Sequence, residues 1–112
     1  MSANRAHIAT LAMTVVLTAD CVAGQLLSFD DAPAGADAPV QGVAMTDGKA
    51  GDAVRVVPIG VLELTAATAI PKGALVYSDA EGRPTAAGAN NPIGRALRAA
   101  SNPGDLVTVL VR

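Results

Sequence analysis

The sequence predicts a small all-β fold, either a barrel or a β-sandwich (β-tulip-like), assembled from short strands. Valine-rich runs alternate apolar and polar residues along the chain, which is typical of half-buried strands because successive side chains point to opposite faces. Turn residues separate the runs at intervals of about eight to twelve residues, the spacing of small β domains. At most one short helical turn is expected, at residues 64–70 before Pro71.

The stretch from Gly42 to Leu64 organises the predicted fold. It contains the turn sequences Asp47-Gly48 and Gly51-Asp52, in which glycine can adopt positive φ without a steric clash. The alternating runs that follow are predicted as two strands, residues 53–57 and 61–64, separated by a proline. The sequence therefore predicts a β-meander at the centre of the chain.

The same pattern returns near the end of the chain. A Gly-x-Ala triplet precedes a Gly-Asp pair by nine residues in the first copy and by ten in the second, and a valine-rich run follows each pair. We interpret the copies as two hairpins of similar geometry rather than as a duplication, because two short matches do not establish a repeat. The residues expected to shape these turns are Gly42, Gly51, Asp52, Gly94, Gly104 and Asp105.

The remaining elements follow from the same patterns. Residues 1–9 are expected to form a flexible N-terminal arm, and residues 10–112 a single β domain. Within that domain, further strands are predicted at residues 14–17, 22–29, 74–77, 93–99 and 106–111, and loops at residues 30–39, 78–84 and 86–92.

Composition limits the size of the core. Of the 112 residues 51% are hydrophobic, but alanine and valine dominate and only 2% are aromatic. Small side chains bury little area each, and burial stabilises by about 25 cal/mol per Å². The domain is therefore expected to gain stability by assembling with partners.

Charge argues against nucleic acid as a partner. The formal net charge is −2, and the eight lysines and arginines are scattered along the sequence, whereas nucleic-acid-binding surfaces cluster basic residues and often add aromatic ones. No membrane partner is expected either, because the apolar run from Ile8 to Ala19 is too short to cross a bilayer.

Residues 5–23 have some features of an export signal. Arg5 precedes the apolar run, and residues 17–21 are similar to a lipoprotein site. However, three threonines interrupt the run, and Asp20 directly precedes Cys21. We therefore favour a strand within the domain and keep an exported surface module as an alternative that depends on cleavage near Cys21.

No catalytic arrangement is predicted. His7 and Cys21 are the only histidine and cysteine, so neither a Cys-His nucleophile pair with a fixed base nor a zinc site is expected. Asp52 and Asp105 are conceivable as an acid/base pair, but an aspartate beside glycine commonly caps backbone N–H groups of its own turn. Lys49 lies in a turn, as does the cofactor-carrying lysine of lipoyl and biotinyl domains. In those domains an acidic or methionine residue directly precedes the lysine, whereas here Gly48 does. We expect no enzyme activity, no cofactor and no metal.

An ordered set of motifs runs through most of the chain, from about Thr14 to Val111. The motifs are Val22-Ala23-Gly24-Gln25, Gly42-Val43-Ala44, Gly51-Asp52-Ala53-Val54-Arg55-Val56, Gly60-Val61, Ile70-Pro71-Lys72-Gly73-Ala74-Leu75-Val76-Tyr77, Gly94-Arg95-Ala96-Leu97 and Gly104-Asp105-Leu106-Val107-Thr108-Val109. In order and spacing this set resembles the capsid cement, or head decoration, proteins of tailed phages, which are small β proteins.

The resemblance implies a non-enzymatic structural role. Such proteins bind the outer surface of an icosahedral head, commonly as trimers, and clamp neighbouring capsid subunits against the pressure of packaged DNA. The implied partners are therefore the major capsid protein and further copies of this chain in a homotrimer. The implied location is the outer surface of the virion capsid, after synthesis in the host cytoplasm.

Capsid contacts are expected at the N-terminal arm, which is apolar enough to become ordered on binding or to add a strand to a capsid sheet edge. A ligand-binding β-clip domain is kept as an alternative because of the sequence at residues 70–73, although Phe29 and Tyr77 are the only aromatic residues available for stacking. The candidate capsid-contact residues are Arg5, His7, Ile8 and Leu11.

Overall fold

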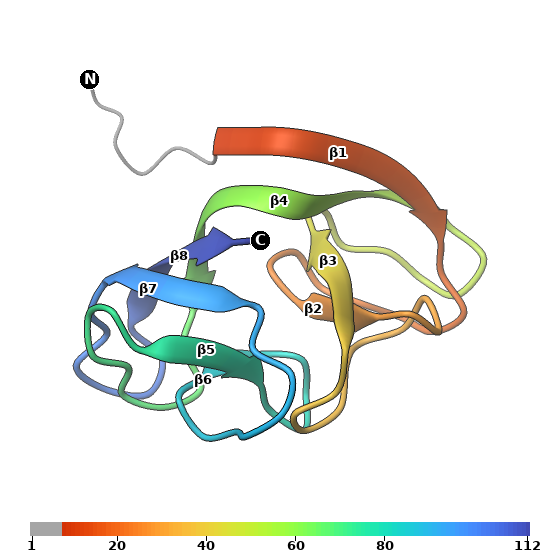
Figure 1. The fold of residues 1–112 in the computed structure, drawn as a ribbon. Helices are drawn as coiled ribbons and strands as arrows, with labels where there is room; N and C mark the ends of the chain where they lie inside the picture. Colours follow the sequence, from red (N-terminus) through yellow and green to blue (C-terminus); the bar gives the residue numbers. More distant parts are fainter. Residues whose placement is uncertain (1–7) are drawn as a thin grey trace.

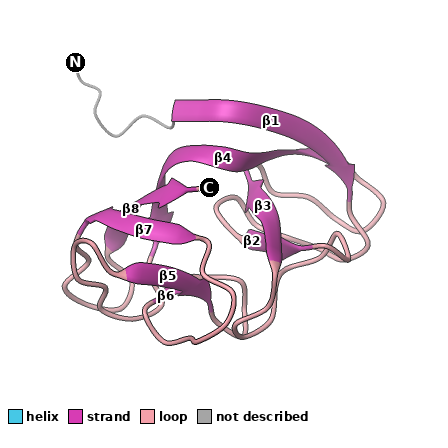
Figure 2. Cartoon of the chain, viewed as in Figure 1, coloured by secondary structure: helices cyan, strands magenta, loops and turns pink. Residues whose placement is uncertain are grey.

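The computed structural model describes residues 8–112, and every regular element within this range is a β-strand (Figure 1, Figure 2). The strands curl into a nearly closed barrel, which confirms the predicted all-β fold. They are β1 (Ile8–Val16), β2 (Leu26–Ser28), β3 (Val40–Ala44), β4 (Ala53–Thr65), β5 (Leu75–Ser78), β6 (Pro84–Thr85), β7 (Gly94–Arg98) and β8 (Leu106–Val111).

β4 connects the two sides of the barrel. The strand order is β2-β3-β4-β8-β7-β5-β6, and β1 pairs with β4 outside this path. All of these pairs are antiparallel. On one edge, the first half of β4 pairs with β3 and its second half with β8, while β1 pairs with the other edge from Ala53 to Val61 (Figure 1). Both sides of the barrel therefore depend on this strand of 13 residues.

Pro58 does not separate two strands, contrary to the sequence prediction. β4 continues through it, and no residue of β1, β3 or β8 is paired with Pro58. On one edge, pairing with β3 reaches Val57 and pairing with β8 begins at Gly60. On the other edge, the register with β1 shifts between Leu11 and Met13. A residue without an N–H group is tolerated at such an irregularity because no ladder bond is lost.

β1 begins earlier than the strand predicted at residues 14–17. It starts at Ile8 and pairs with β4 along its length, ending with Val16 opposite Ala53. Ile8 and Ala9 are therefore strand residues rather than part of the predicted arm. The remaining residues of the predicted flexible arm, 1–7, lie outside the described part of the chain.

Two further differences have local explanations. The strand predicted at residues 22–29 is reduced to β2, because Gly24 has a φ of +87° in a turn directly before that strand. The helical turn allowed at residues 64–70 does not form. Instead β4 continues, and the Ala66 N–H group donates to Asp105 O at 2.8 Å, in a distant segment. The other predicted strands and loops agree with the structure to within a few residues.

The core consists mainly of valine, leucine and alanine side chains. The main cluster is formed by strands of both sides of the barrel, and its members with no exposed surface are Leu26, Val43, Leu62, Ile70, Val76, Val107 and Val109. A second cluster contains Val15, Leu17, Cys21, Leu27, Ala44, Val54 and Val56. Cys21 is thus one of the buried apolar residues that pack between β1, β3 and β4.

The two Gly-Asp turns have the same geometry. The glycine has positive φ in both, +94° at Gly51 and +90° at Gly104. The aspartate carboxylate accepts a hydrogen bond from the N–H group three residues earlier, at 2.9 Å for Asp52 and 3.1 Å for Asp105. These distances confirm that both aspartates are turn caps.

The correspondence extends far beyond the turns. Residues 13–16 of β1 pair with residues 53–56 of β4 in the same register as residues 62–65 of β4 pair with residues 106–109 of β8. The first strands of the two units are thus offset by 49 residues, from residue 13 to residue 62. The β2–β3 pair likewise matches the β5–β7 pair.

Isolated bridges repeat as well. Cys21 and Gly48 exchange two backbone hydrogen bonds, as do Ile70 and Ala100 in the second unit. The repeat therefore covers whole four-strand units rather than two hairpins, which corrects the sequence interpretation. The short sequence matches did not reveal the full repeat, because residues of different types form the equivalent backbone contacts in the two units.

Gly42 and Gly94 lie in strands β3 and β7 rather than in turns. A Cβ atom on Gly42 would lie 2.6 Å from Val56 Cγ1 on β4, and one on Gly94 would lie 1.8 Å from Leu110 O on β8. These glycines are therefore required by the close approach of the next strand.

Asp37 fastens the acidic loop of residues 30–39 to the rest of the barrel. Its carboxylate accepts hydrogen bonds at 3.0–3.3 Å from the backbone N–H groups of Ala89, Asn90 and Asn91. These bonds, that of Asn91 foremost, lower the pKa of Asp37 below its usual value. Asp37 also has a φ of +51°, which aspartate and asparagine tolerate better than most residues.

Replacing Gly94 with alanine is expected to destabilise the fold by about 3 kcal/mol or more, because the added Cβ meets the Leu110 backbone. Thermal unfolding followed by circular dichroism measures the change. Gly35→Ala is the control, since a Cβ there meets nothing within 4 Å, and its effect should stay within about 0.5 kcal/mol. Equal melting temperatures for Gly94→Ala and the unchanged chain would contradict the close β7–β8 contact.

Asp37→Asn is expected to lower stability near neutral pH and to have little effect in acid. Because the folded-state pKa of Asp37 is lowered, its contribution is present above the unfolded-state pKa of about 3.9 and is lost as the pH falls through the folded-state value. Urea titrations of both proteins from about pH 7 to about pH 2 measure the difference in unfolding free energy. A difference that stays constant over this range would argue against a role for the charge.

Candidate functional site

The structure places two of the four predicted capsid-contact residues. Arg5 and His7 lie outside the described residues. Ile8 opens β1, and Leu11 is paired with Ile59 of β4. The Leu11 side chain is 51% exposed. The part of the predicted set that can be placed therefore belongs to a strand at the outside of the barrel.

β1 and the adjoining part of β4 expose a group of apolar side chains, here called the β1 patch. It consists of Leu11, Met13 and Ile59, which are 51%, 37% and 39% exposed. The sequence analysis proposed Leu11 as a capsid contact but did not name Met13 or Ile59, because it began the strand at Thr14 and had no means of pairing it with β4. The uncharged run of residues 8–16 is the sequence signal that would have revealed the patch.

The edge of β1 that faces away from β4 has no paired strand among residues 8–112. Figure 1 shows β1 at the periphery of the barrel. An edge strand leaves N–H and C=O groups available for a further strand, and proteins commonly protect such edges with charged residues or proline. None of the nine residues of β1 is charged, and none is a proline.

The turn aspartates Asp52 and Asp105 make the same hydrogen bond in their two turns. The carboxylates of Asp52 and Asp105 each cap the N–H group of a residue in their own turn. They belong to equivalent turns of the two repeat units, next to Gly51 and Gly104. Each carboxylate therefore stabilises its own turn.

Cys21 is held among apolar side chains beside acidic turns. Burial raises the pKa of its thiol, and the carboxylates of Asp47 and Asp20 act in the same direction, while a backbone hydrogen bond from Gly48 opposes them. The thiol is thus protonated at neutral pH, and its Sγ lies 3.7 Å from Thr46 O. Within residues 8–112, no group of three His, Cys, Asp or Glu side chains could hold a metal ion.

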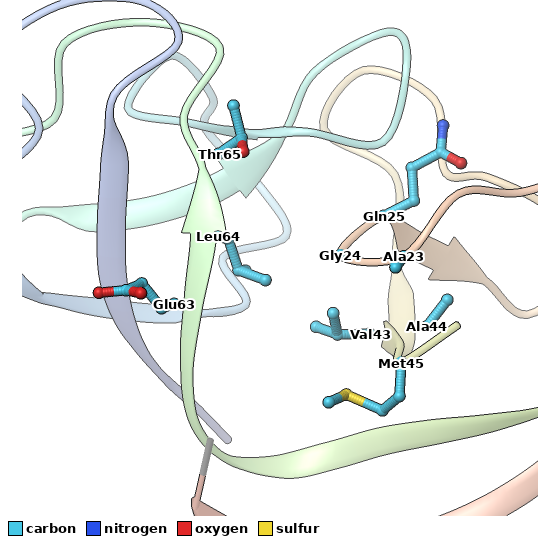
Figure 3. A pocket seen from close by; sticks show the side chains of 9 residues that line it. All are labelled: Ala23, Gly24, Gln25, Val43, Ala44, Met45, Glu63, Leu64 and Thr65. Carbon is cyan, nitrogen blue, oxygen red and sulfur yellow. The ribbon is translucent and has the colours of Figure 1, made fainter. Parts of the chain in front are cut away.

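A cavity of about 170 Å³ lies between the second half of β4 and the segments at the end of β3 (Figure 3). Val43 and Leu64 point into the space between the two strands in Figure 3. None of the lining residues is aromatic, so the β-clip alternative gains no stacking surface here. The lining residues are Ala23, Gly24, Gln25, Val43, Ala44, Met45, Glu63, Leu64 and Thr65.

The apolar run behind the export alternative is an integral part of the barrel. β1 pairs with β4 at seven positions, and Val15 and Leu17 are buried in the second core cluster. Cleavage near Cys21 would remove both the strand and these core side chains. The structure also contains, between residues 8 and 112, no helix of the length and hydropathy needed to cross a membrane.

Comparison with known proteins gives a consistent result. The search of curated proteins found no match. Among solved structures, the chain is similar to the head fiber gp8.5 N base of bacteriophage phi29, with a TM-score of 0.69 and 22% sequence identity over 91% of this chain and 93% of that chain. At this identity the likeness concerns the fold.

The sequence model of one family, described as phage cement protein, matches residues 5–112. This range includes all eight strands of the barrel. The chain therefore belongs to the phage cement protein family, and it is a structural protein of the phage head.

Proposed function

We propose that this protein binds the outer surface of a phage head and cements neighbouring major capsid subunits, so that the shell resists the pressure of packaged DNA. The observation that carries the proposal is the family match over residues 5–112. The partner in this proposal is the major capsid protein, and the contribution of the chain is mechanical rather than enzymatic.

The surface of the barrel supports a protein partner. The β1 patch places Leu11, Met13 and Ile59 next to a strand edge that has no partner within residues 8–112, and grouped apolar side chains of this kind commonly mark protein interfaces. The scattered basic residues and the net charge of −2 do not suit the phosphate backbone of nucleic acid.

We infer that three copies act together. The core is made of small side chains, with 2% aromatic residues in the sequence, and such a domain gains stability by association. A trimer would present three β1 patches and three N-terminal segments to the head. Linked weak contacts of this kind bind tightly without any single large interface.

The protein is expected to bind heads of the phage that encodes it and to strengthen them. Purified protein should sediment with DNA-free heads, saturate at three copies per binding site, and raise the temperature at which undecorated, DNA-filled heads release DNA. Light scattering gives the mass of the free protein, and bovine albumin serves as the control for unspecific pelleting. Failure to sediment with heads at any concentration would refute the proposal.

Deletion of residues 1–7 is expected to weaken head binding by about tenfold or more while leaving the melting temperature unchanged, because β1 begins only at Ile8. The reason is that this segment is proposed to contact the capsid through Arg5 and His7. Arg5→Ala should weaken binding in the same direction, and Arg98→Ala on β7 is the matched control. Unchanged affinity of the deletion variant would show that the contacts lie elsewhere.

A further inference from the structure

The internal repeat indicates what belongs beside β1. β1 in the first unit is equivalent to the second half of β4 in the second unit, since residues 13–16 pair with β4 as residues 62–65 pair with β8. Equivalent positions of these two strands are 49 residues apart over residues 13–16, and the pairing of β1 with β4 shifts by one residue between Leu11 and Met13. The neighbours of one strand can therefore be compared with the neighbours of the other.

In the second unit, the equivalent strand is covered on both edges at its start. Gly60 pairs with Val111 of β8 and with Ala9 of β1, and Val61 pairs with Leu110 and Ile8 of the same two strands. Shifting residues 59–61 back by the 49-residue offset places the equivalent point at residues 10–12 of β1. There the β4 side is paired at Leu11, whereas the opposite side has no partner among the described residues.

We propose that β1 accepts one further antiparallel strand along this edge, centred on residues 10–12, and that this strand is an extended segment of a capsid subunit. The inference rests on the proposed function and names the part of the surface through which the partner is held. Main-chain hydrogen bonds supply most of the affinity in strand addition, and neighbouring side chains select the sequence.

The composition of β1 defines the chemistry of the added strand. No residue of β1 is charged, and Leu11 and Met13 are exposed beside the edge. A charged side chain placed over them would lose water without gaining a counter-ion, which costs free energy. The added segment is therefore uncharged, with apolar side chains on the face that meets the β1 patch.

The size of the edge favours a capsid segment over a second free copy of this chain. A strand along the nine residues of β1 covers an edge about 30 Å long and about 5 Å wide. Each partner of a stable complex buries about 800 Å², far more than this edge offers. The contact is too small to hold two free copies together, but it suits a head on which many copies bind side by side.

Leu11→Lys tests the inference, because a lysine on an edge strand opposes strand addition and Leu11 is 51% exposed in the free chain. Leu106→Lys on β8 is the matched control, since Leu106 is 50% exposed. Sedimentation with DNA-free heads should show binding about tenfold weaker for Leu11→Lys and unchanged for Leu106→Lys. Both variants should have the same melting temperature as the unchanged chain.

Hydrogen exchange of the full chain separates strand pairing from a side-chain contact. Amides of residues 8–16 should exchange more slowly in head-bound protein than in free protein. Equal exchange in both states would overturn the inference, and so would undiminished binding of Leu11→Lys. Protection of β1 that rises with the concentration of the free protein would also overturn it, because it would indicate pairing between copies of this chain. If the unchanged chain fails to bind heads, the proposed function is refuted and this inference with it.

Discussion

The pairing of β4 with strands on both of its edges holds the barrel together. Its first half completes the unit that contains β1, β2 and β3, and its second half begins the unit that contains β5, β7 and β8. Val54 and Val56 of β4 pack in the second core cluster, while Leu62 and Leu64 pack in the main one. One continuous strand thus contributes side chains to both cores.

Sharing a strand between units leaves β1, the strand at the start of the series, paired on one edge only within residues 8–112. Each unit takes its first strand from outside its own hairpins: β4 serves the second unit, and β1 serves the first. The free edge of β1 is therefore a consequence of the repeat and not of its side chains. What the sequence adds is the lack of charge and proline along β1, so this edge is left without the usual protection against pairing.

The sequence-based predictions were accurate for features that depend on neighbouring residues and inaccurate for features that depend on residues far along the chain. The Gly51-Asp52 and Gly104-Asp105 turns were predicted correctly, because a positive φ and an aspartate cap depend on only a few neighbouring residues. The continuity of β4 and the early start of β1 depend on partners far along the chain, and both were missed. For the same reason Leu11 was proposed as a capsid contact while Ile59, its partner across the strands, was not considered.

Backbone contacts rather than particular side chains maintain this fold. Cys21 and Ile70 occupy equivalent bridges in the two units, although one is a thiol and the other a branched hydrocarbon. The same tolerance holds between proteins, since the phi29 head fiber base keeps the fold at 22% identity. A barrel specified in this way leaves its surface side chains free to vary. In the proposed complex, strand addition gives affinity through the backbone, so adaptation to a particular capsid falls to the few side chains beside the β1 edge.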